Sequence, residues 1–313
     1  MIGFLGRRIA AMVPVLLVVA VVVFLILRLA PGDPAAVIGG DNATSDDIAR
    51  IRQQLGLAEP IWTQFVIWFS KVLHGDLGYS YYLNKPVAEL IAQRIEPTAS
   101  LTVATLLLAL ILALPLGTLA AWRMGGWLDR GVMAFSVAGF SVPVFVVGYV
   151  LIFVFALELK WLPVQGYARI ARGLGPWMRQ LVLPCVALAL IYVALLARVT
   201  RAAVSEALTE DYVRTARAKG IGELAVLWRH ALANAAIPII TVAGISAAQL
   251  IGGVVVTETV FSIPGLGQLT VDAVLSRDFP VIQGVVLLFS VVYVALNLLV
   301  DASYVFLDPR IRY

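Results

Sequence analysis

The sequence predicts an all-α integral membrane protein with six transmembrane helices. Apolar residues make up 61% of the 313-residue chain and charged residues only 13%, whereas soluble domains carry about 25% charged residues. A water-soluble surface needs more polar cover than this, so the bilayer is the expected solvent. Six stretches are long enough to cross the hydrocarbon layer and lack Asp, Glu, Lys and Arg in their central parts. They are residues 9–27, 98–122, 131–157, 181–197, 231–257 and 279–300.

The first stretch is expected to be a retained transmembrane helix rather than a cleaved signal peptide. Arg7 and Arg8 precede it, but its apolar run is too long for a typical signal sequence and no cleavage site is evident. The motif Pro31-Gly32-Asp33-Pro34 is expected to end this helix, because proline lacks a backbone donor and glycine favours a turn.

The distribution of basic residues favours a topology with both termini in the cytoplasm. With six spans, this topology places about half of the 23 Lys and Arg residues in the cytoplasmic segments. These segments are much shorter than the outer ones, so the density of basic residues is higher on the cytoplasmic side. The cytoplasmic basic residues are then Arg7, Arg8, Arg123, Arg130, Arg198, Arg201, Arg214, Arg217, Lys219, Arg229, Arg310 and Arg312.

The segment 31–97 is the largest piece outside the predicted spans and forms an external insertion after the first one. Capping residues 44–47 predict a helix that runs to about Leu55 and ends at Gly56. Apolar side chains at helical spacing after Pro60 predict an amphipathic helix, which packs on the protein itself or lies at the membrane interface. The other outer segments, 158–180 and 258–278, contain Gly and Pro, so no long regular helix is expected there.

The stretch between the fourth and fifth predicted spans is the most informative. It has no proline before Pro238 and is expected to be helical throughout, with Glu210 and Arg214 at a favourable i,i+4 spacing. A short basic helix, 212–220, is expected to stop at Gly220 in a left-handed cap. Small residues there permit close approach of a partner, and the alternative is an ordinary charged loop that touches lipid headgroups.

Several chemistries are excluded because the sequence lacks the residues or motifs that they require. The single cysteine, Cys185, cannot form an intrachain disulfide, and with only His74 and His230 there is no Cys/His metal cluster. No Gly-x-x-x-x-Gly-Lys-Ser/Thr phosphate loop occurs, so the chain is not expected to hydrolyse ATP. Neither histidine accompanies a nucleophile within a span, so an intramembrane protease is excluded as well. The basic residues are spread over several loops and do not indicate nucleic-acid binding.

Polar residues inside the predicted spans are few. Gln249, Ser246 and Asn297 are candidates for a translocation path, because a polar side chain in hydrocarbon needs a partner or a water-filled cavity. Small residues around 244–253 either pack helices closely or leave room for a solute. An ion-coupled secondary transporter usually has charged residues at mid-membrane, and the central parts of these spans have none, so this class is only a distant alternative.

The stretch Glu210–Gly220, followed by 230–235 and Pro238, resembles the membrane subunits of dipeptide, oligopeptide, glutathione and nickel ABC importers. The general importer loop has Glu-Ala-Ala, three residues and Gly; here Arg214 and Thr215 replace the Glu and the first Ala, whereas Ala216 and Gly220 match. The departures are usual in the peptide branch. Further matching motifs are Pro31–Pro34, Gln54–Leu57, Leu73–Gly78, Trp161–Pro163, Glu258–Gly267, Arg277–Gly284 and Asp308–Arg312.

The resemblance implies a type I ABC importer permease-like fold and a division into three parts. These are a first transmembrane helix (1–30), an external loop domain (31–97) and a five-helix core (98–313) with a cytoplasmic coupling loop (198–232). A coupling helix in that loop would sit in a groove of an ATP-binding subunit. The implied contact residues are Tyr212, Arg214, Thr215, Ala216, Arg217, Ala218, Lys219 and Gly220.

The resemblance also implies partners and a location. The partners are a second homologous permease, two ATP-binding subunits that hold ATP and Mg²⁺, membrane lipid and an external solute-binding protein facing 31–97 and 258–278. The location is the bacterial inner membrane, and the chain itself needs no cofactor. Peptides, as dipeptides or oligopeptides, are the expected solutes, with glutathione, opines or nickel chelates as alternatives.

Overall fold

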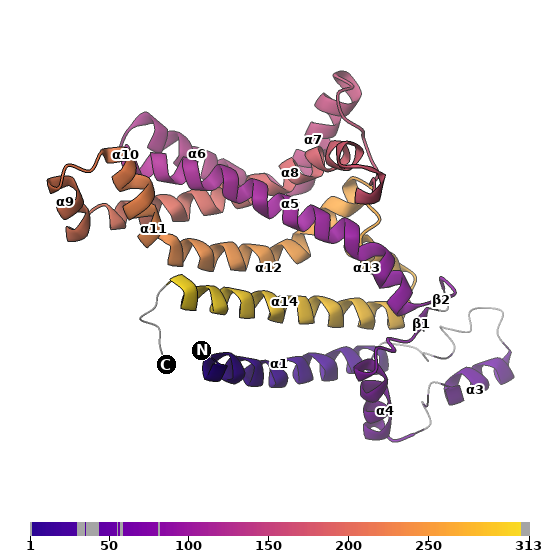
Figure 1. Ribbon diagram of the computed structural model, residues 1–313. Helices are drawn as coiled ribbons and strands as arrows, with labels where there is room; N and C mark the ends of the chain where they lie inside the picture. The colour runs from indigo at the N-terminus through magenta and orange to yellow at the C-terminus, as the bar shows by residue number, and fades with distance from the viewer. Residues whose placement is uncertain are drawn as a thin grey trace. The chain divides into compact units, whose positions relative to one another are not determined.

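The structure is a computed structural model that describes residues 2–29, 35, 44–54, 56, 59–80 and 82–307. Pro31–Pro34 and Asp308–Arg312, two of the motifs noted above, lie outside these residues. The described chain is helical except for loops and one short hairpin, in which β1 (Tyr79–Ser80) pairs antiparallel with β2 (Lys85–Pro86). Figure 1 labels the elements.

Five helices are long enough and apolar enough to cross a membrane, and a bent pair makes a sixth span if it counts as one. The five are α1 (Ile2–Leu29), α5 (Val87–Trp122), α8 (Leu174–Ala207), α12 (Ala236–Val260) and α14 (Phe279–Leu307). The bent pair joins α6 (Trp127–Ser141) to α7 (Val144–Leu151), which continues as the π-helix η1 (Ile152–Glu158). Five of the predicted spans are therefore confirmed in their predicted order, and the predicted third span corresponds to the bent pair.

The third span differs from the continuous helix expected over 131–157, because it bends by 99° between α6 and α7. Val142 is extended, with φ −101° and ψ 122°. Pro143 favours this break, because its ring disfavours a helical conformation at the preceding residue and it offers no backbone donor to α6. Pro14, Pro115 and Pro184 lie inside α1, α5 and α8 without ending those helices, so a proline in an apolar run does not by itself break a span.

The fourth span is also longer than expected. Residues 181–197 were predicted, but α8 continues at both ends over 34 residues. The extension toward Ala207 includes Arg198 and Arg201, which end the apolar run without ending the helix. Hydropathy thus marks the part of the helix in hydrocarbon, while backbone hydrogen bonding continues beyond it.

The external segment contains the two predicted helices. The first, α3, covers Ser45–Gln54, and the second, α4, covers Ile61–Leu73 after Pro60. The later outer segments contain only short elements before the next span: the 3₁₀ turn η2 (Ile170–Arg172) and α13 (Leu266–Leu275).

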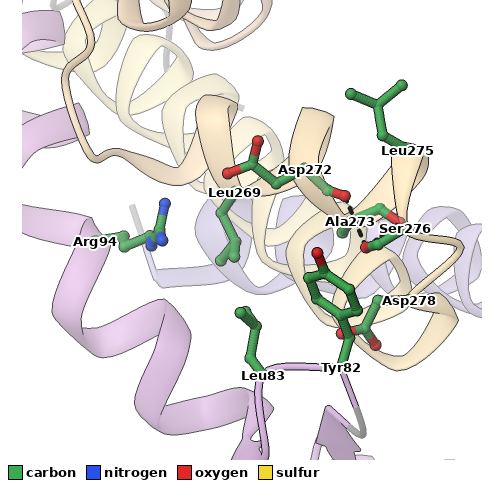
Figure 2. Close-up of a pocket in the computed structure, with 9 residues that line it drawn as sticks. All are labelled: Tyr82, Leu83, Arg94, Leu269, Asp272, Ala273, Leu275, Ser276 and Asp278. Atoms are coloured by element: carbon green, nitrogen blue, oxygen red, sulfur yellow. Dashed lines mark hydrogen bonds between the residues drawn. The ribbon is translucent and has the colours of Figure 1, made fainter.

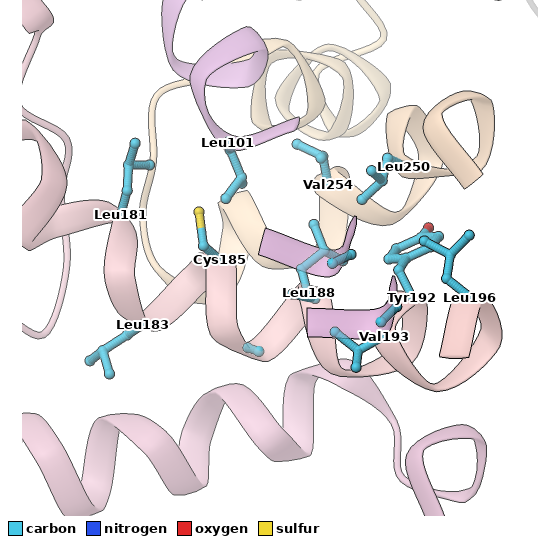
Figure 3. Close-up of a cluster of buried hydrophobic side chains, with 14 of the residues drawn as sticks. Leu101, Leu181, Leu183, Cys185, Leu188, Tyr192, Val193, Leu196, Leu250 and Val254 are labelled. Atoms are coloured by element: carbon cyan, nitrogen blue, oxygen red, sulfur yellow. The ribbon is translucent and has the colours of Figure 1, made fainter. Parts of the chain in front are cut away.

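The chain divides into two compact units. One comprises residues 97–267 and 296–313, and the other comprises 2–96 and 268–295. In the first unit α8 is central, packing against α6, α7 and α12. Its buried side chains, including Leu188 and Leu196, meet Leu101 of α5 and Leu250 of α12 in one apolar cluster (Figure 3).

Close helix approach in this unit depends on glycine. A Cβ on Gly117 would lie 2.5 Å from the backbone oxygen of Ala197, and one on Gly139 would lie 2.9 Å from the Cβ of Ala194. Both glycines face α8, so α5 and α6 approach its backbone directly.

In the second unit, two buried polar contacts join segments that are distant in sequence. Gln283 Nε2 of α14 donates to the backbone oxygen of Val23 at 2.9 Å. Ser80 Oγ of the hairpin donates to a carboxylate oxygen of Asp278, immediately before α14. Each contact satisfies polar atoms that would be costly to bury alone.

Candidate functional site

The predicted coupling segment forms a distinct short helix, α9 (Asp211–Ala218), after α8. The segment was expected to be helical throughout, but it consists of α9, α10 (Glu223–Ala225), the π-helix η3 (Val226–Ala231) and α11 (Leu232–Asn234). A turn after Ala207 and the left-handed Gly220 interrupt it. Helix propensity alone did not predict the first break, where Thr209 Oγ1 donates back to the oxygen of Glu206 at 2.7 Å.

Gly220 ends α9 with a left-handed cap, as expected. Its φ is 78°. Gly220 N donates to Arg217 O at 2.9 Å, and Ile221 N donates to Ala216 O at 3.2 Å. This pattern is the Schellman motif, in which glycine avoids the steric cost of a Cβ at positive φ. The glycine therefore has a structural role in the turn, independent of any partner.

One face of α9 is fixed against its own chain. Val213 is fully buried and Ala216 is 6% exposed, and both pack against Val226 of η3, with Leu208 and Ile221 at the edge. The small size of Ala216 serves this internal packing. A partner would meet the opposite side of the helix.

That opposite side is exposed and basic. Arg214, Thr215, Arg217, Ala218 and Lys219 are all exposed. Arg214 Nη1 lies 3.2 Å from Asp211 Oδ1, so its partner is Asp211 instead of the expected Glu210.

A second ion pair connects α9 to α10. Nε and Nη2 of Arg217 donate to Oε1 and Oε2 of Glu223 at 2.8 and 3.2 Å. This two-point contact crosses the turn at Gly220 and fixes the orientation of the guanidinium. Both side chains remain accessible, at 40% and 48% exposure.

Tyr212 lies at the edge of this surface. Burial raises the pKa of its hydroxyl, and the nearby Glu210 carboxylate adds to this effect, while a hydrogen bond with the Asn234 side chain opposes it.

The three candidate path residues do not share one environment. Ser246 is fully buried, Gln249 is exposed and Asn297 is half-buried. The Ser246 hydroxyl has no hydrogen-bond partner in the described part of the chain.

The neighbouring small residues mostly pack helices. A Cβ on Gly244 would lie 2.0 Å from a methyl group of Val300 on α14, and Gly253 faces Tyr192 of α8. Gly252, by contrast, faces open space.

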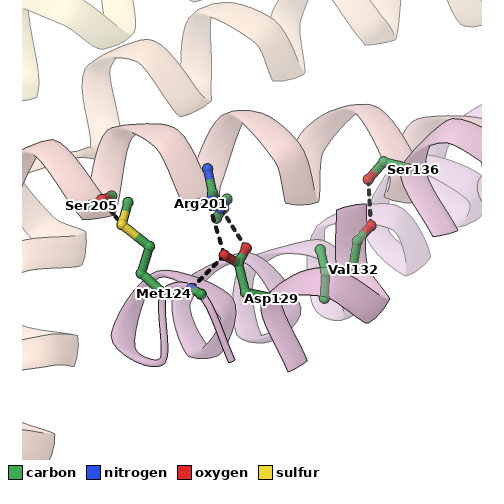
Figure 4. A network of polar contacts seen from close by, with 7 residues as sticks. Met124, Asp129, Val132, Ser136, Arg201 and Ser205 are labelled. Atoms are coloured by element: carbon green, nitrogen blue, oxygen red, sulfur yellow. Dashed lines mark hydrogen bonds and ion pairs between the residues drawn. The ribbon is translucent and has the colours of Figure 1, made fainter. Parts of the chain in front are cut away.

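Sequence reasoning missed one polar contact near the coupling segment. Arg201 Nε and Nη2 contact Asp129 Oδ1 and Oδ2 at 2.6 and 2.8 Å, and Gly125 N donates to the same carboxylate at 2.9 Å (Figure 4). The sequence shows only that Asp129 and Arg201 lie in two different predicted cytoplasmic segments. They cannot be paired without knowing that α6 lies against α8.

A second missed feature is the buried carboxylate of Glu258 near the end of α12. It accepts a 2.6 Å hydrogen bond from Thr98 Oγ1, which in turn accepts one from Leu266 N at 2.8 Å. A Cβ on Gly265 or Gly267 would lie within 3 Å of the carboxylate. This packing explains both glycines in the Glu258–Gly267 motif.

The second unit contains a pocket of about 430 Å³ (Figure 2). The hairpin region contributes Tyr82 and Leu83, α5 contributes Arg94, and residues 269–278 form the rest of the wall. The pocket therefore combines the two external segments predicted to face a solute-binding protein. Burial raises the pKa of Asp278 in its wall, and the Ser80 hydroxyl and Val281 backbone bonds partly oppose this shift.

Known proteins agree with this architecture. Residues 113–313 match the family described as binding-protein-dependent transport system inner membrane component, and residues 1–102 match its N-terminal family. A probable peptide ABC transporter permease of Sinorhizobium fredii is 53% identical over 99% of both chains. The glutathione transport system permease of Escherichia coli is 42% identical over the full length of both chains.

A solved structure shows the same fold. A chain of the inward-facing methionine ABC transporter MetNI superposes with a TM-score of 0.59 at 18% identity, covering 70% of this chain and 96% of that one. Family members are transport subunits rather than enzymes, and they act with ATP-binding subunits and a solute-binding protein. The chain therefore belongs to the inner-membrane components of binding-protein-dependent transport systems, the multi-pass permease subunits of bacterial ABC importers.

Proposed function

We propose that this permease imports peptides or closely related solutes, and that α9 is the helix through which ATP-binding subunits drive it. The proposed role of α9 rests on the different environments of its two faces, one packed and one exposed. Its inner face is packed on the chain through Val213 and Ala216, so a force applied to its exposed face is transmitted to the rest of the segment. ATP and Mg²⁺ would be held by the partner subunits.

The solute class is supported by the relatives. The Sinorhizobium relative is named a probable peptide permease and the Escherichia coli relative a glutathione permease. Glutathione is itself a tripeptide, so a peptide-like solute is consistent with the names of both relatives. In the proposed complex this chain pairs with a second homologous permease, and Ser246, Gln249 and Asn297 contribute to the path between them.

The pocket supports a role for the external segments in receiving the solute-binding protein. Its walls come from segments 31–97 and 258–278, and they combine Arg94, Asp272 and exposed apolar side chains. A surface with both charges and apolar groups suits a transient interface, which must form and release in each cycle. We propose the same three parts by role: a first transmembrane helix (1–30), an external loop domain (31–97) and a permease core (98–313) with the coupling loop 198–232.

The decisive experiment compares a tryptophan substitution on the exposed face of α9 with one on α8, in the complete complex in liposomes. Ala218→Trp places a bulky indole on the exposed face and is expected to abolish solute-stimulated ATP hydrolysis and uptake without changing the unfolding midpoint. Ala202→Trp, at an exposed position of α8, is the matched control and should retain both activities. Gly220→Trp is less suitable, because any side chain at its φ of 78° also strains the turn.

The outcomes separate the two parts of the proposal. Normal coupling in a folded Ala218→Trp complex would refute α9 as the contact. Uptake of labelled dipeptide that is unaffected by excess unlabelled peptide or glutathione would refute the solute class. Uptake without ATP would favour a gradient-driven carrier instead.

A further inference from the structure

Helix α4 has apolar side chains on two faces, and within the described residues only one of these faces is packed against the protein. On the packed face, the rings of Phe65 and Trp68 lie 5.2 and 5.5 Å from the ring of Phe24 on α1. On the other face, Trp62, Val66 and Leu73 are 69%, 63% and 70% exposed. Their spacing of four and seven residues places these three side chains in one stripe along the helix.

The polar residues of α4 gather on the remaining side. At 3.6 residues per turn, Thr63, Gln64, Ser70 and Lys71 fall opposite the two apolar faces. Ile67 is the one apolar residue among them. The helix therefore has a wide apolar arc, half of which contacts α1, and a polar arc directed elsewhere.

The depth of α4 follows from its contact with α1. The apolar part of that spanning helix runs from Gly6 to Ile26, so Phe24 lies two residues from its end. Figure 1 shows α4 running across this end of α1 instead of along it. A helix that crosses the end of a membrane-spanning helix runs along the membrane surface.

The helix that α4 contacts already needs an apolar environment. Only 17% of the α1 span is buried, and Val18, Val22 and Ile26 are 61%, 52% and 40% exposed. Tryptophan is enriched at the boundary between hydrocarbon and headgroups because its ring is both apolar and polar. The apolar–polar division of α4 is typical of helices lying in that boundary.

We propose that α4 is an interfacial helix, with Trp62, Val66 and Leu73 in contact with lipid at the membrane surface where α1 ends. The contact fixes the external segment at a defined height above the bilayer. This inference rests on α1 crossing the membrane and is independent of the transported solute.

The test uses nitroxide labels on single cysteines in the complete complex, in liposomes of phosphatidylethanolamine and phosphatidylglycerol. The buried Cys185 is first replaced by alanine. Labels at Trp62, Val66 and Leu73 should collide more often with lipid-soluble oxygen than with a water-soluble nickel chelate. A label at Ser70, on the polar arc, should show the reverse preference, and Tyr82 provides an exposed reference.

Two results would overturn the proposal. Preference for the nickel chelate along the stripe would place α4 in water, and protection from both reagents would show that a protein subunit covers it. A second measurement guards against effects of the labels: Val66→Asp should shift the label at Leu73 toward water, whereas Ser70→Asp should leave it in lipid. Equal effects of the two aspartates would count against lipid contact at Val66.

Discussion

Asp129 and Arg201 form a two-bond ion pair that joins the start of α6 to the later part of α8. Their side chains are 7% and 23% exposed. Gly117 of α5 meets α8 at the same level, where a Cβ would lie 3.0 Å from Arg201 N. Three helices are therefore fixed together ten residues before α9 begins.

Removal of either partner should destabilise the protein. Asp129→Asn or Arg201→Ala leaves a largely buried charge without its partner, which costs about 3–5 kcal/mol when burial is complete. Because Arg201 retains some solvent contact, a loss of about 1–3 kcal/mol is expected. The midpoint of unfolding in detergent measures it.

Arg198→Ala is the control for that experiment. Its guanidinium lies 5.5 Å from the Phe140 ring centre, and the side chain is exposed. Exposed contacts of this kind contribute about 0.5–1 kcal/mol. An equal loss in the Arg198 and Arg201 variants would show that the Asp129 pair has no special role.

Gly220 should tolerate asparagine better than alanine. A Cβ at this position meets no other atom within 4 Å, so any cost arises from the φ of 78° and not from crowding. The left-handed conformation costs a non-glycine residue about 1–2 kcal/mol, and asparagine is among the residues that adopt it more readily. Amide exchange in α9 should therefore be fastest in Gly220→Ala, intermediate in Gly220→Asn and slowest in wild type. The reverse order would exclude backbone strain as the reason for glycine.

Gly265 and Gly131 should respond oppositely to alanine. A Cβ on Gly265 would lie 2.1–2.5 Å from the Glu258 carboxyl group, whereas one on Gly131 in α6 meets nothing within 4 Å. Overpacking of a well-packed site costs about 1–3 kcal/mol. Alanine in an accessible helix position instead gains about 0.4–1 kcal/mol. Unfolding midpoints should fall for Gly265→Ala and rise slightly for Gly131→Ala, and a neutral Gly265→Ala would show that the carboxylate is free to move.

Asp278 should make stability depend on pH. Burial raises its pKa in the folded protein above the ordinary value of 3.8. The folded state then binds more protons than the unfolded state between the two values, so this contribution to stability is lost as pH rises through the raised pKa. Asp278→Asn should flatten this part of the pH profile of the unfolding midpoint, with Asp272→Asn as the control. A profile unchanged by Asp278→Asn would contradict the assignment.

The spans and α9 were predictable because each depends on local pattern. Apolar runs without charges identified the membrane helices, and Gly220 after a basic helix predicted the cap that the structure shows. These features need only the residues that form them. The family resemblance came from the same local motifs and is confirmed by relatives that match over the whole chain.

The contacts between distant segments could not be predicted. Thr98 and Glu258 are 160 residues apart, and nothing in either local pattern indicates that they meet. The bend at Val142 was missed for a different reason. Hydropathy averages over the whole run and does not respond to one proline, and proline alone is not a sufficient signal, because Pro115 and Pro184 lie inside unbroken spans.

The length of α8 has a mechanical consequence. Thirty-four helical residues extend about 51 Å, well beyond the roughly 30 Å of hydrocarbon. The end that carries α9 therefore projects past the membrane as a rigid arm. In the coupling role proposed for α9, a slight tilt of α8 would therefore move this tip farther than it moves the packed residues around Leu188.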